Sequence, residues 1–186
     1  MPTKKIIIGI VGEIASGKGT ATKYLIEKYQ AANYRFSTAL RDVLNRVYVE
    51  IKRENMQTLS QILRENFGQE LLARVMAEDV KKESNPLIVI DGVRRFTDIT
   101  HLKQLPEFKL IYIVADMEKR FERLRLRREN EDDANKTLEQ FKLDSQAEAE
   151  KEITAVGQTA YYIINNNGSF EDLYRQIDEI ITKLNL

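Results

Sequence analysis

The chain of 186 residues contains no cysteine, and its 29 basic residues are balanced by 29 acidic ones. The absence of cysteine excludes disulfide bonds and thiolate metal sites, and it agrees with the reducing cytoplasm in which we expect the protein. A balanced charge produces no net positive field that would gather nucleic acid or an anionic membrane surface. Neither is therefore expected as a partner.

Long apolar runs are missing as well, since no segment approaches the roughly 20 apolar residues that a membrane helix requires. The run at 6–11 follows two lysines, as in a signal peptide, but Glu13 comes directly after it and no small-residue cleavage site appears. We interpret this run as the first strand of a soluble protein. No internal repeat or Pro/Gly-rich linker divides the chain, and its length is typical of one domain, so we predict a single domain over residues 1–186.

Short apolar runs recur along the chain between longer amphipathic stretches. The runs are 5–11, a weaker one at 34–37, 87–90, 109–114 and 161–164. Because they are continuous rather than alternating, both faces of each strand are expected to be covered, as in a parallel sheet between two layers of helices. The sequence therefore predicts an α/β fold. A last helix is expected to begin after Ser169 as N-cap, with Asp172 three residues later.

Two segments interrupt this alternation of strands and helices. Residues 39–82 have helical spacing without a strand and are broken near Asn55 and Gly68. Residues 128–157 are very polar, with few large apolar side chains. Insertions of this kind commonly form movable parts over a rigid α/β core, and their closure excludes water from a transferring phosphoryl group.

The segment GEIASGKGT, residues 12–20, follows the first apolar run and precedes a helical stretch. In this context a glycine-rich turn lines up backbone N–H groups around phosphate oxygens, and a lysine reaches the terminal phosphates. The pattern usually places a hydroxyl directly after the lysine, whereas here Gly19 stands there and Thr20 follows. The nucleotide-binding residues that we predict are Gly12, Ala15, Ser16, Gly17, Lys18, Gly19 and Thr20.

A second candidate site is the segment LIVIDGVRR, residues 87–95. An apolar strand that ends in an acid places Asp91 at the carboxyl edge of the sheet, where it can orient Mg²⁺ directly or through water. A strand-terminal Asp-Gly is also a common turn, so Asp91 by itself does not decide between the two. Arg94 and Arg95 favour anion binding, because guanidinium groups hold phosphate oxygens bidentately.

A third motif follows the run at 109–114. On a helix, Arg120, Arg123 and Arg127 share a face, and as a set they would supply fixed positive charge to a triphosphate. The alternative is a solvated charged face on which these arginines pair with neighbouring glutamates.

Together these motifs resemble adenylate kinase and the other P-loop nucleoside monophosphate kinases, a group related to deoxynucleoside monophosphate kinases and dephospho-CoA kinase. GKGT occupies the family's phosphate loop, residues 91–95 are similar to its D-G-F-P-R, and Arg123 with Arg127 is similar to the R-x-x-x-R at the start of its lid. The resemblance implies a three-layer fold whose five-stranded parallel sheet has the order 2-3-1-4-5. It also implies a helical acceptor-binding insertion at about 39–82 and a lid at about 128–157.

The resemblance further implies an enzyme that transfers the γ-phosphoryl group of Mg-ATP to a nucleoside or deoxynucleoside monophosphate. ATP and Mg²⁺ are the expected cofactors, a small-molecule phosphoryl acceptor is the expected partner, and the protein would be a monomer or homodimer. The residues implied are Lys18, Arg95, Arg123 and Arg127 for catalysis, Thr38, Arg41, Arg94 and Arg95 for the acceptor, and Thr20 and Asp91 for the metal, through water.

Two alternatives stay open. One is a dephospho-CoA kinase-like enzyme. The other is a nucleotide-dependent switch that hydrolyses ATP slowly and has no phosphoryl acceptor. Arg94 and Arg95 favour a kinase, which must hold two ligands, whereas the low number of arginines after Arg128 favours a switch.

Overall fold

The computed structural model describes residues 5–127, 136–145 and 148–185. Its centre is a five-stranded sheet in the order β2-β3-β1-β4-β5, and every neighbouring pair of strands is parallel. The strands are β1 (Ile6–Val11), β2 (Ala32–Arg35), β3 (Leu87–Asp91), β4 (Phe108–Val114) and β5 (Tyr162–Asn165). The predicted fold class and strand order are confirmed.

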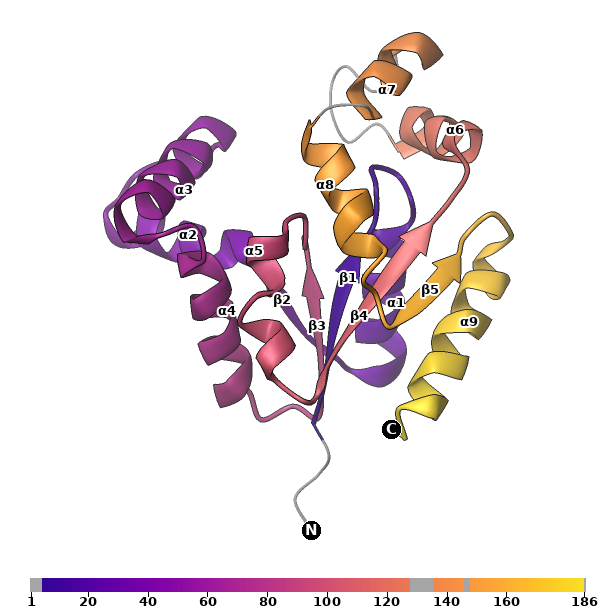
Figure 1. Ribbon diagram of the computed structural model, residues 1–186, viewed down its shortest axis with the longest axis horizontal. Helices are drawn as coiled ribbons and strands as arrows, with labels where there is room; N and C mark the ends of the chain where they lie inside the picture. Colours follow the sequence, from indigo (N-terminus) through magenta and orange to yellow (C-terminus); the bar gives the residue numbers. More distant parts are fainter. Residues whose placement is uncertain (1–4, 128–135, 146–147, 186) are drawn as a thin grey trace.

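The central strand β1 is buried on both faces because its side chains alternate between two apolar clusters. Ile6, Ile8 and Ile10 point into one cluster, and Ile7 and Val11 point into the other. The first cluster is covered by α1 and α9, and the second by α4, α5 and α8 (Figure 1). These helices are α1 (Lys18–Tyr29), α4 (Leu71–Lys82), α5 (Phe96–Ile99), α8 (Glu148–Gly157) and α9 (Phe170–Lys183). Burial on both faces explains why the strand sequence is continuously apolar.

Three helices separate β2 from β3, namely α2 (Phe36–Arg46), α3 (Arg53–Phe67) and α4, and they lie on the left of Figure 1. The predicted break at Gly68 is confirmed, but the other break precedes α3, which contains Asn55. The weak run at 34–37 also misplaced β2, because Phe36 already begins α2. β2 is an edge strand, and it ends where Arg35 pairs with Asp91, the last residue of its neighbour β3.

The polar segment after β4 contains α6 (Met117–Arg127) and α7 (Leu138–Ser145) before α8. Residues 128–135 and 146–147 of the predicted lid lie outside the described residues. Phe141 of α7 is fully buried and packs with Leu124 of α6 and with Ala15 of the glycine-rich loop. Its ring centroid is 5.7 Å from that of Phe121. The segment is therefore attached to the core next to the loop.

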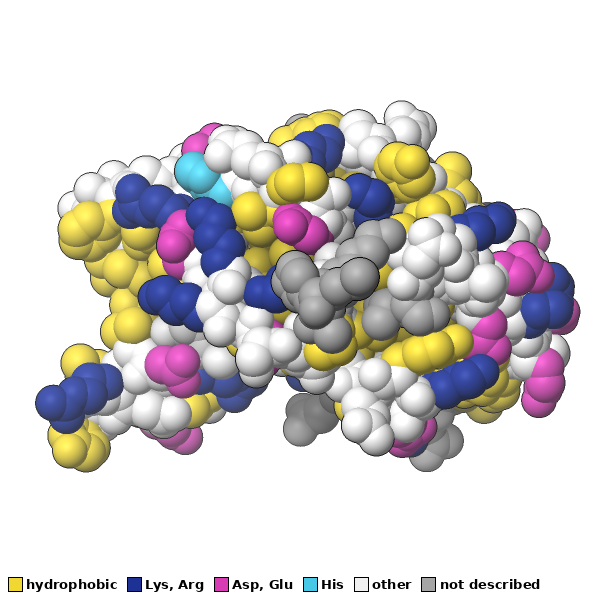
Figure 2. Space-filling view, turned by 90° about the horizontal axis from the view of Figure 1, so that it is seen from below, with side chains coloured by type: hydrophobic (Ala, Val, Ile, Leu, Met, Phe, Trp, Pro, Cys, Tyr) yellow, Lys and Arg dark blue, Asp and Glu magenta, His cyan; other side chains and the backbone are white. Residues whose placement is uncertain are grey.

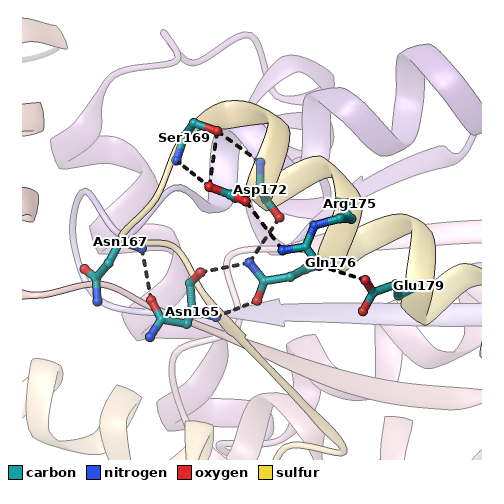
Figure 3. Close-up of polar contacts among 7 residues, drawn as sticks. All are labelled: Asn165, Asn167, Ser169, Asp172, Arg175, Gln176 and Glu179. Carbon is teal, nitrogen blue, oxygen red and sulfur yellow. Dashed lines mark hydrogen bonds and ion pairs between the residues drawn. The ribbon is translucent and has the colours of Figure 1, made fainter.

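Side-chain hydrogen bonds fix the turn from β5 to α9 (Figure 3). The Ser169 hydroxyl accepts from the N–H of Asp172 at 3.2 Å, and the Asp172 carboxylate accepts from the N–H of Ser169 at 3.2 Å, which confirms the predicted cap. The side-chain amide of Gln176 donates to the carbonyl of Asn165 and accepts from its N–H. The N–H of Asn167 donates to the Asn165 side chain at 3.0 Å. The chain is thus held firmly where β5 ends.

Charged side chains of both signs are spread among apolar and neutral ones over the end of the molecule from which the strands start (Figure 2). This view agrees with the equal numbers of basic and acidic residues in the sequence. Among the helices of the described ranges, none has the length and apolar character needed to cross a membrane.

The carboxylate of Asp178 joins α9 to α1. It accepts hydrogen bonds from the hydroxyls of Tyr24 and Tyr29 at 2.9 and 2.7 Å and from Lys28 Nζ at 2.8 Å. Tyr174 stacks on Tyr24 with ring centroids 4.0 Å apart. Burial raises the pKa of Asp178, but these hydrogen bonds outweigh it and leave the pKa below its ordinary value. Burial, followed by the bond to Asp178, raises the pKa of Tyr29 to about 12.

We expect Asp178→Asn to lower the free energy of unfolding by roughly 1–2 kcal/mol at neutral pH, because hydrogen bonds to a partly exposed carboxylate are lost. The difference should shrink below about pH 4, since a depressed native pKa stabilises the fold only while the carboxylate is ionised. Urea unfolding at several pH values measures both effects. Glu179→Gln is the control, because Glu179 pairs with the exposed Arg175. Equal losses in the two variants would contradict the role given to Asp178.

Candidate functional site

The glycine-rich loop connects the end of β1 to the start of α1 at the carboxyl edge of the sheet. Its backbone is left-handed at Ala15 (φ 59°) and at Gly17 (φ 105°), and Gly17 is the N-cap of α1. Left-handed residues within such a turn direct successive N–H groups to one side, and the helix N-terminus adds the positive end of its dipole. The loop therefore has the backbone form that holds a phosphate group.

The inside of the loop is tightly folded. A Cβ atom at Gly12 would lie 2.5 Å from Ser16 Oγ and 2.6 Å from the carbonyl oxygen of Ile113, so this position requires glycine. Ser16 is fully buried, and its Oγ has no hydrogen-bond partner among the residues that the structure describes. An unpaired buried hydroxyl is costly, and an anion in the loop would provide its partner. The residues present thus fit a bound phosphate.

Lys18 is the first residue of α1, and its Nζ donates a hydrogen bond to the carbonyl oxygen of Glu13 at 2.8 Å. The side chain therefore folds back over the loop. Gly19 is exposed and Thr20 is half-buried in the first turn of the same helix. The structure brings all seven residues of the predicted nucleotide-binding set together between β1 and the first turn of α1.

An arginine of α6 neutralises a carboxylate inside the loop. Glu13 Oε1 lies 3.1 Å from Nη2 of Arg120, which is only 3% exposed. The Arg120 guanidinium also donates to the carbonyl oxygens of Ala115 and Ile14, at 3.2 and 3.4 Å, and lies over the ring of Phe141. The alternative of a solvated charged face is wrong for this residue, because Arg120 is buried and binds the loop. A glutamate within a phosphate-binding turn was the one signal that could have indicated such a partner.

Asn166, directly after β5, reaches the loop from another side. The side-chain Nδ2 of Asn166 donates to the backbone carbonyl oxygen of Ser16 at 2.8 Å. The backbone carbonyl oxygen of Asn166 accepts from Arg123 Nη2 at 2.8 Å. The second terminal nitrogen of Arg123, Nη1, is buried without a hydrogen-bond partner in the described part of the chain. The structure thus places Arg123 beside the loop with an N–H group to offer. None of the sequence motifs includes Asn166.

The turn after β3 carries the next predicted residues. Asp91 Oδ2 lies 3.5 Å from Nε of Arg35, the last residue of β2. Arg94 and Arg95 are exposed, and their backbone N–H groups both donate to Asp98 Oδ2 at 3.0 Å. The backbone of the turn is therefore fixed while both guanidinium groups face solvent.

Asp98 also ties this turn to the helical insertion. It is 4% exposed, and its Oδ1 lies 3.4 Å from Nη2 of Arg64 on α3. Arg64 Nη1 donates in turn to the carbonyl oxygen of Gln69 at 2.8 Å. From α8, the Glu152 carboxylate accepts from the N–H of Phe96 at 3.1 Å. Neither Asp98 nor Arg64 belongs to a recognisable motif, so their roles are not predicted from the sequence.

Thr38 and Arg41 are both exposed on α2. Thr38 lines a cavity of about 180 Å³ between β2, α2 and α4, together with residues such as Phe36, Asp42 and Val75. The residues that line this cavity include neither Arg41 nor any part of the glycine-rich loop. Of the predicted acceptor residues, Thr38 lines this cavity, whereas Arg41, Arg94 and Arg95 do not.

The remaining predictions concern Arg127 and the metal. Arg127 ends α6, and its side chain lies outside the described residues. Within the described ranges no group of three or more histidine or carboxylate side chains could hold a metal ion. Mg²⁺ in phosphoryl-transfer sites commonly uses only one or two protein oxygens together with substrate phosphates. Thr20 lies in the first turn of α1, and Asp91 ends β3 beside Arg35, so a metal site at these two residues stays a prediction.

These features define the class of protein, since a parallel sheet of this order with a glycine-rich loop after β1 is the P-loop kinase fold. Solved structures agree. Shikimate kinase from Bacteroides thetaiotaomicron superimposes with a TM-score of 0.65 at 15% identity, covering 97% of this chain and 99% of that chain. A protein from Thermus thermophilus superimposes with a TM-score of 0.60 at 18% identity, covering 98% of this chain and 100% of that chain. At these identities the similarity shows the fold.

Sequence comparison identifies the family. Residues 11–142 match the family described as AAA domain. A UPF0200 protein from Staphylothermus marinus is 30% identical over 181 residues, which cover 97% of this chain and 94% of that protein. A UPF0200 protein from Thermococcus kodakarensis is 30% identical over 188 residues, which cover 96% of this chain and 100% of that protein. The chain therefore belongs to the family described as AAA domain and to the UPF0200 proteins.

We expect Asp98→Ala to lower the free energy of unfolding by about 3–5 kcal/mol, because it leaves Arg64 unpaired and two backbone N–H groups without acceptor. Arg64→Met should cost much less in the Asp98→Ala background than alone, since the buried charge has then already lost its partner. Denaturant unfolding of the four proteins measures this coupling. Glu78→Ala, which removes the exposed ion pair with Lys81, should change little. Additive losses for Asp98 and Arg64 would show that the pair is not coupled.

Proposed function

We propose that the protein transfers the γ-phosphoryl group of ATP to a nucleoside or deoxynucleoside monophosphate. The observation that carries this proposal is the glycine-rich loop with Lys18 folded over it and arginines on two sides. Arg123 approaches from α6, and Arg94 with Arg95 follows β3 on the opposite side of β1. A kinase must bind two phosphorylated ligands, whereas a switch needs only one. Two separate groups of arginines support the kinase.

On the donor side, Lys18 and the N–H groups of residues 17–20 would bind the β and γ phosphates. Gly12, Ala15 and Ser16 would shape the loop around them. Arg123 and Arg127 would balance the charge of the triphosphate once water is excluded. Thr20 and Asp91 would hold Mg²⁺, mostly through water, and the bound ion would neutralise charge on the phosphate oxygens.

On the acceptor side, Arg94 and Arg95 would orient the acceptor phosphate, and the site would be completed by Thr38 and by Arg41, which belongs to the insertion at 39–82. Asp91 would be kept in place by Arg35. Catalysis would rest on positioning and on fixed positive charge, without a covalent intermediate on the protein. The segment at 128–157 would act as the lid of a single domain.

The alternatives differ in the acceptor. A dephospho-CoA kinase-like enzyme would use the same donor site with another acceptor, and the shikimate kinase fold adds small hydroxyl acceptors to those worth testing. A nucleotide switch gains support from one contact, since Phe141 of α7 packs on Ala15 of the loop and would link α7 to nucleotide occupancy.

A panel of acceptors tests the proposal. With Mg-ATP present, ADP release should rise well above background only with the correct member among nucleoside monophosphates, deoxynucleoside monophosphates, dephospho-CoA and shikimate. Lys18→Ala should fold normally and lower kcat by at least ~10²-fold, because one preorganised charge on the terminal phosphates is lost. ATP turnover that no acceptor changes would favour the switch. Full activity of well-folded Lys18→Ala would remove the phosphate-loop assignment.

The two groups of arginines should separate in steady-state kinetics. We expect Arg95→Ala to impair mainly the use of the acceptor and Arg127→Ala to impair mainly the use of ATP or the maximal rate. An arginine on a transferring phosphoryl group contributes roughly 10³ to 10⁵ in rate, so the losses should be large. Arg175→Ala is the control, because Arg175 is exposed on α9 and pairs with Asp172 and Glu179. Identical effects of both variants on both substrates would contradict this division.

A further inference from the structure

The residue that follows β5 contacts both anion-binding elements of the donor side. Asn166 is 6% exposed, and its Nδ2 donates to the carbonyl oxygen of Ser16 at 2.8 Å. A Cβ atom added at Gly17 would lie 2.1 Å from the same nitrogen. The amide therefore rests against the two loop residues that directly precede Lys18, in space that any larger side chain at Gly17 would need.

The backbone of Asn166 makes the second connection. Its N–H donates to the carbonyl oxygen of Val114 at 2.8 Å, which continues the pairing of β4 with β5. Its carbonyl oxygen accepts from Nη2 of Arg123 at 2.8 Å. One residue thus holds the loop with its side chain and Arg123 with its backbone, so the spacing between them depends on where Asn166 lies.

The position of Asn166 is itself fixed from both sides. Before it, the backbone of Asn165 is bound by the side-chain amide of Gln176 (Figure 3). After it, the side chain of Asn167 accepts from the N–H of Asp116 at 2.7 Å and donates to the Asp116 carboxylate at 3.0 Å. A residue held in this way keeps its geometry without reorganisation when an anion binds, which is the condition for electrostatic preorganisation.

We infer that Asn166 is a positioning residue for nucleotide binding, which sets the phosphate loop against Arg123 and does not itself contact the phosphates. This inference rests on the proposed binding of ATP. It adds that the strength of binding depends on a neutral donor at position 166. An aspartate would match the amide in size but would present a carboxylate to the Ser16 carbonyl oxygen and to the anion site.

Affinity for Mg-ATP tests the inference without knowledge of the acceptor. Asn166→Ala and Asn166→Asp should each weaken binding of Mg-ATP by about tenfold or more, which corresponds to about 1.4 kcal/mol. Asn66→Ala is the matched control, since the side chain of Asn66 is exposed on α3 and donates to the carbonyl oxygen of Ile62 in the same helix. Equilibrium dialysis with Mg-ATP and thermal unfolding of each variant provide the two readouts.

A double variant separates positioning from packing. If Asn166 sets the spacing between the loop and Arg123, Asn166→Ala combined with Arg123→Ala should lose less affinity than the product of the two single losses. In turnover with an accepted substrate, the Asn166 variants should change the KM for ATP or kcat and leave the KM for the acceptor unchanged. If Asn166→Ala fails to fold, the aspartate variant carries the same comparison because it keeps the volume of the side chain.

The outcomes distinguish this inference from the proposed function. Failure of the wild-type protein to bind Mg-ATP would overturn the proposed function together with the inference. Binding by the wild-type protein with unchanged affinity in both Asn166 variants would overturn the inference alone. Lower thermal stability with unchanged affinity would show that Asn166 serves packing and would also overturn it.

Discussion

A carboxylate within the glycine-rich loop must be neutralised before the loop can hold a phosphate group, and the arrangement around the loop depends on this requirement. Glu13 is neutralised by Arg120, whose guanidinium is almost completely buried. Removing one partner of such a pair leaves an uncompensated buried charge, so the pair fixes α6 beside the loop. Arg123 lies close to one turn further along α6, so the same ion pair helps to place its guanidinium beside Asn166.

A second buried ion pair, between Asp98 and Arg64, lies on the other side of β1 and fixes the elements there. Asp98 binds the backbone of the turn that carries Arg94 and Arg95, and it binds Arg64 of the helical insertion. The turn and the insertion are thereby held as one unit. The two proposed sides of the site, for the donor and for the acceptor, are thus stabilised by separate interactions.

The sheet explains why these groups meet at all. β1 is buried on both faces, and its neighbours β3 and β4 run parallel to it, so the loop, the Asp91 turn and α6 all start from the same edge. α7 is added to this edge through Phe141, which contacts both Arg120 and Ala15. One packed aromatic ring therefore joins α7 to the loop and to α6.

The sequence by itself determined the sheet, the glycine-rich loop and the cap of α9, because these depend on neighbouring residues: continuous apolar runs, the spacing of glycine and lysine, and Ser169 three residues before Asp172. It did not determine the limits of β2, an edge strand whose end depends on its neighbour. Nor did it determine the roles of Arg120, Asp98 and Asn166. Only the tertiary structure decided these, because a buried polar side chain acquires its role from partners on other elements, and those partners are distant along the chain.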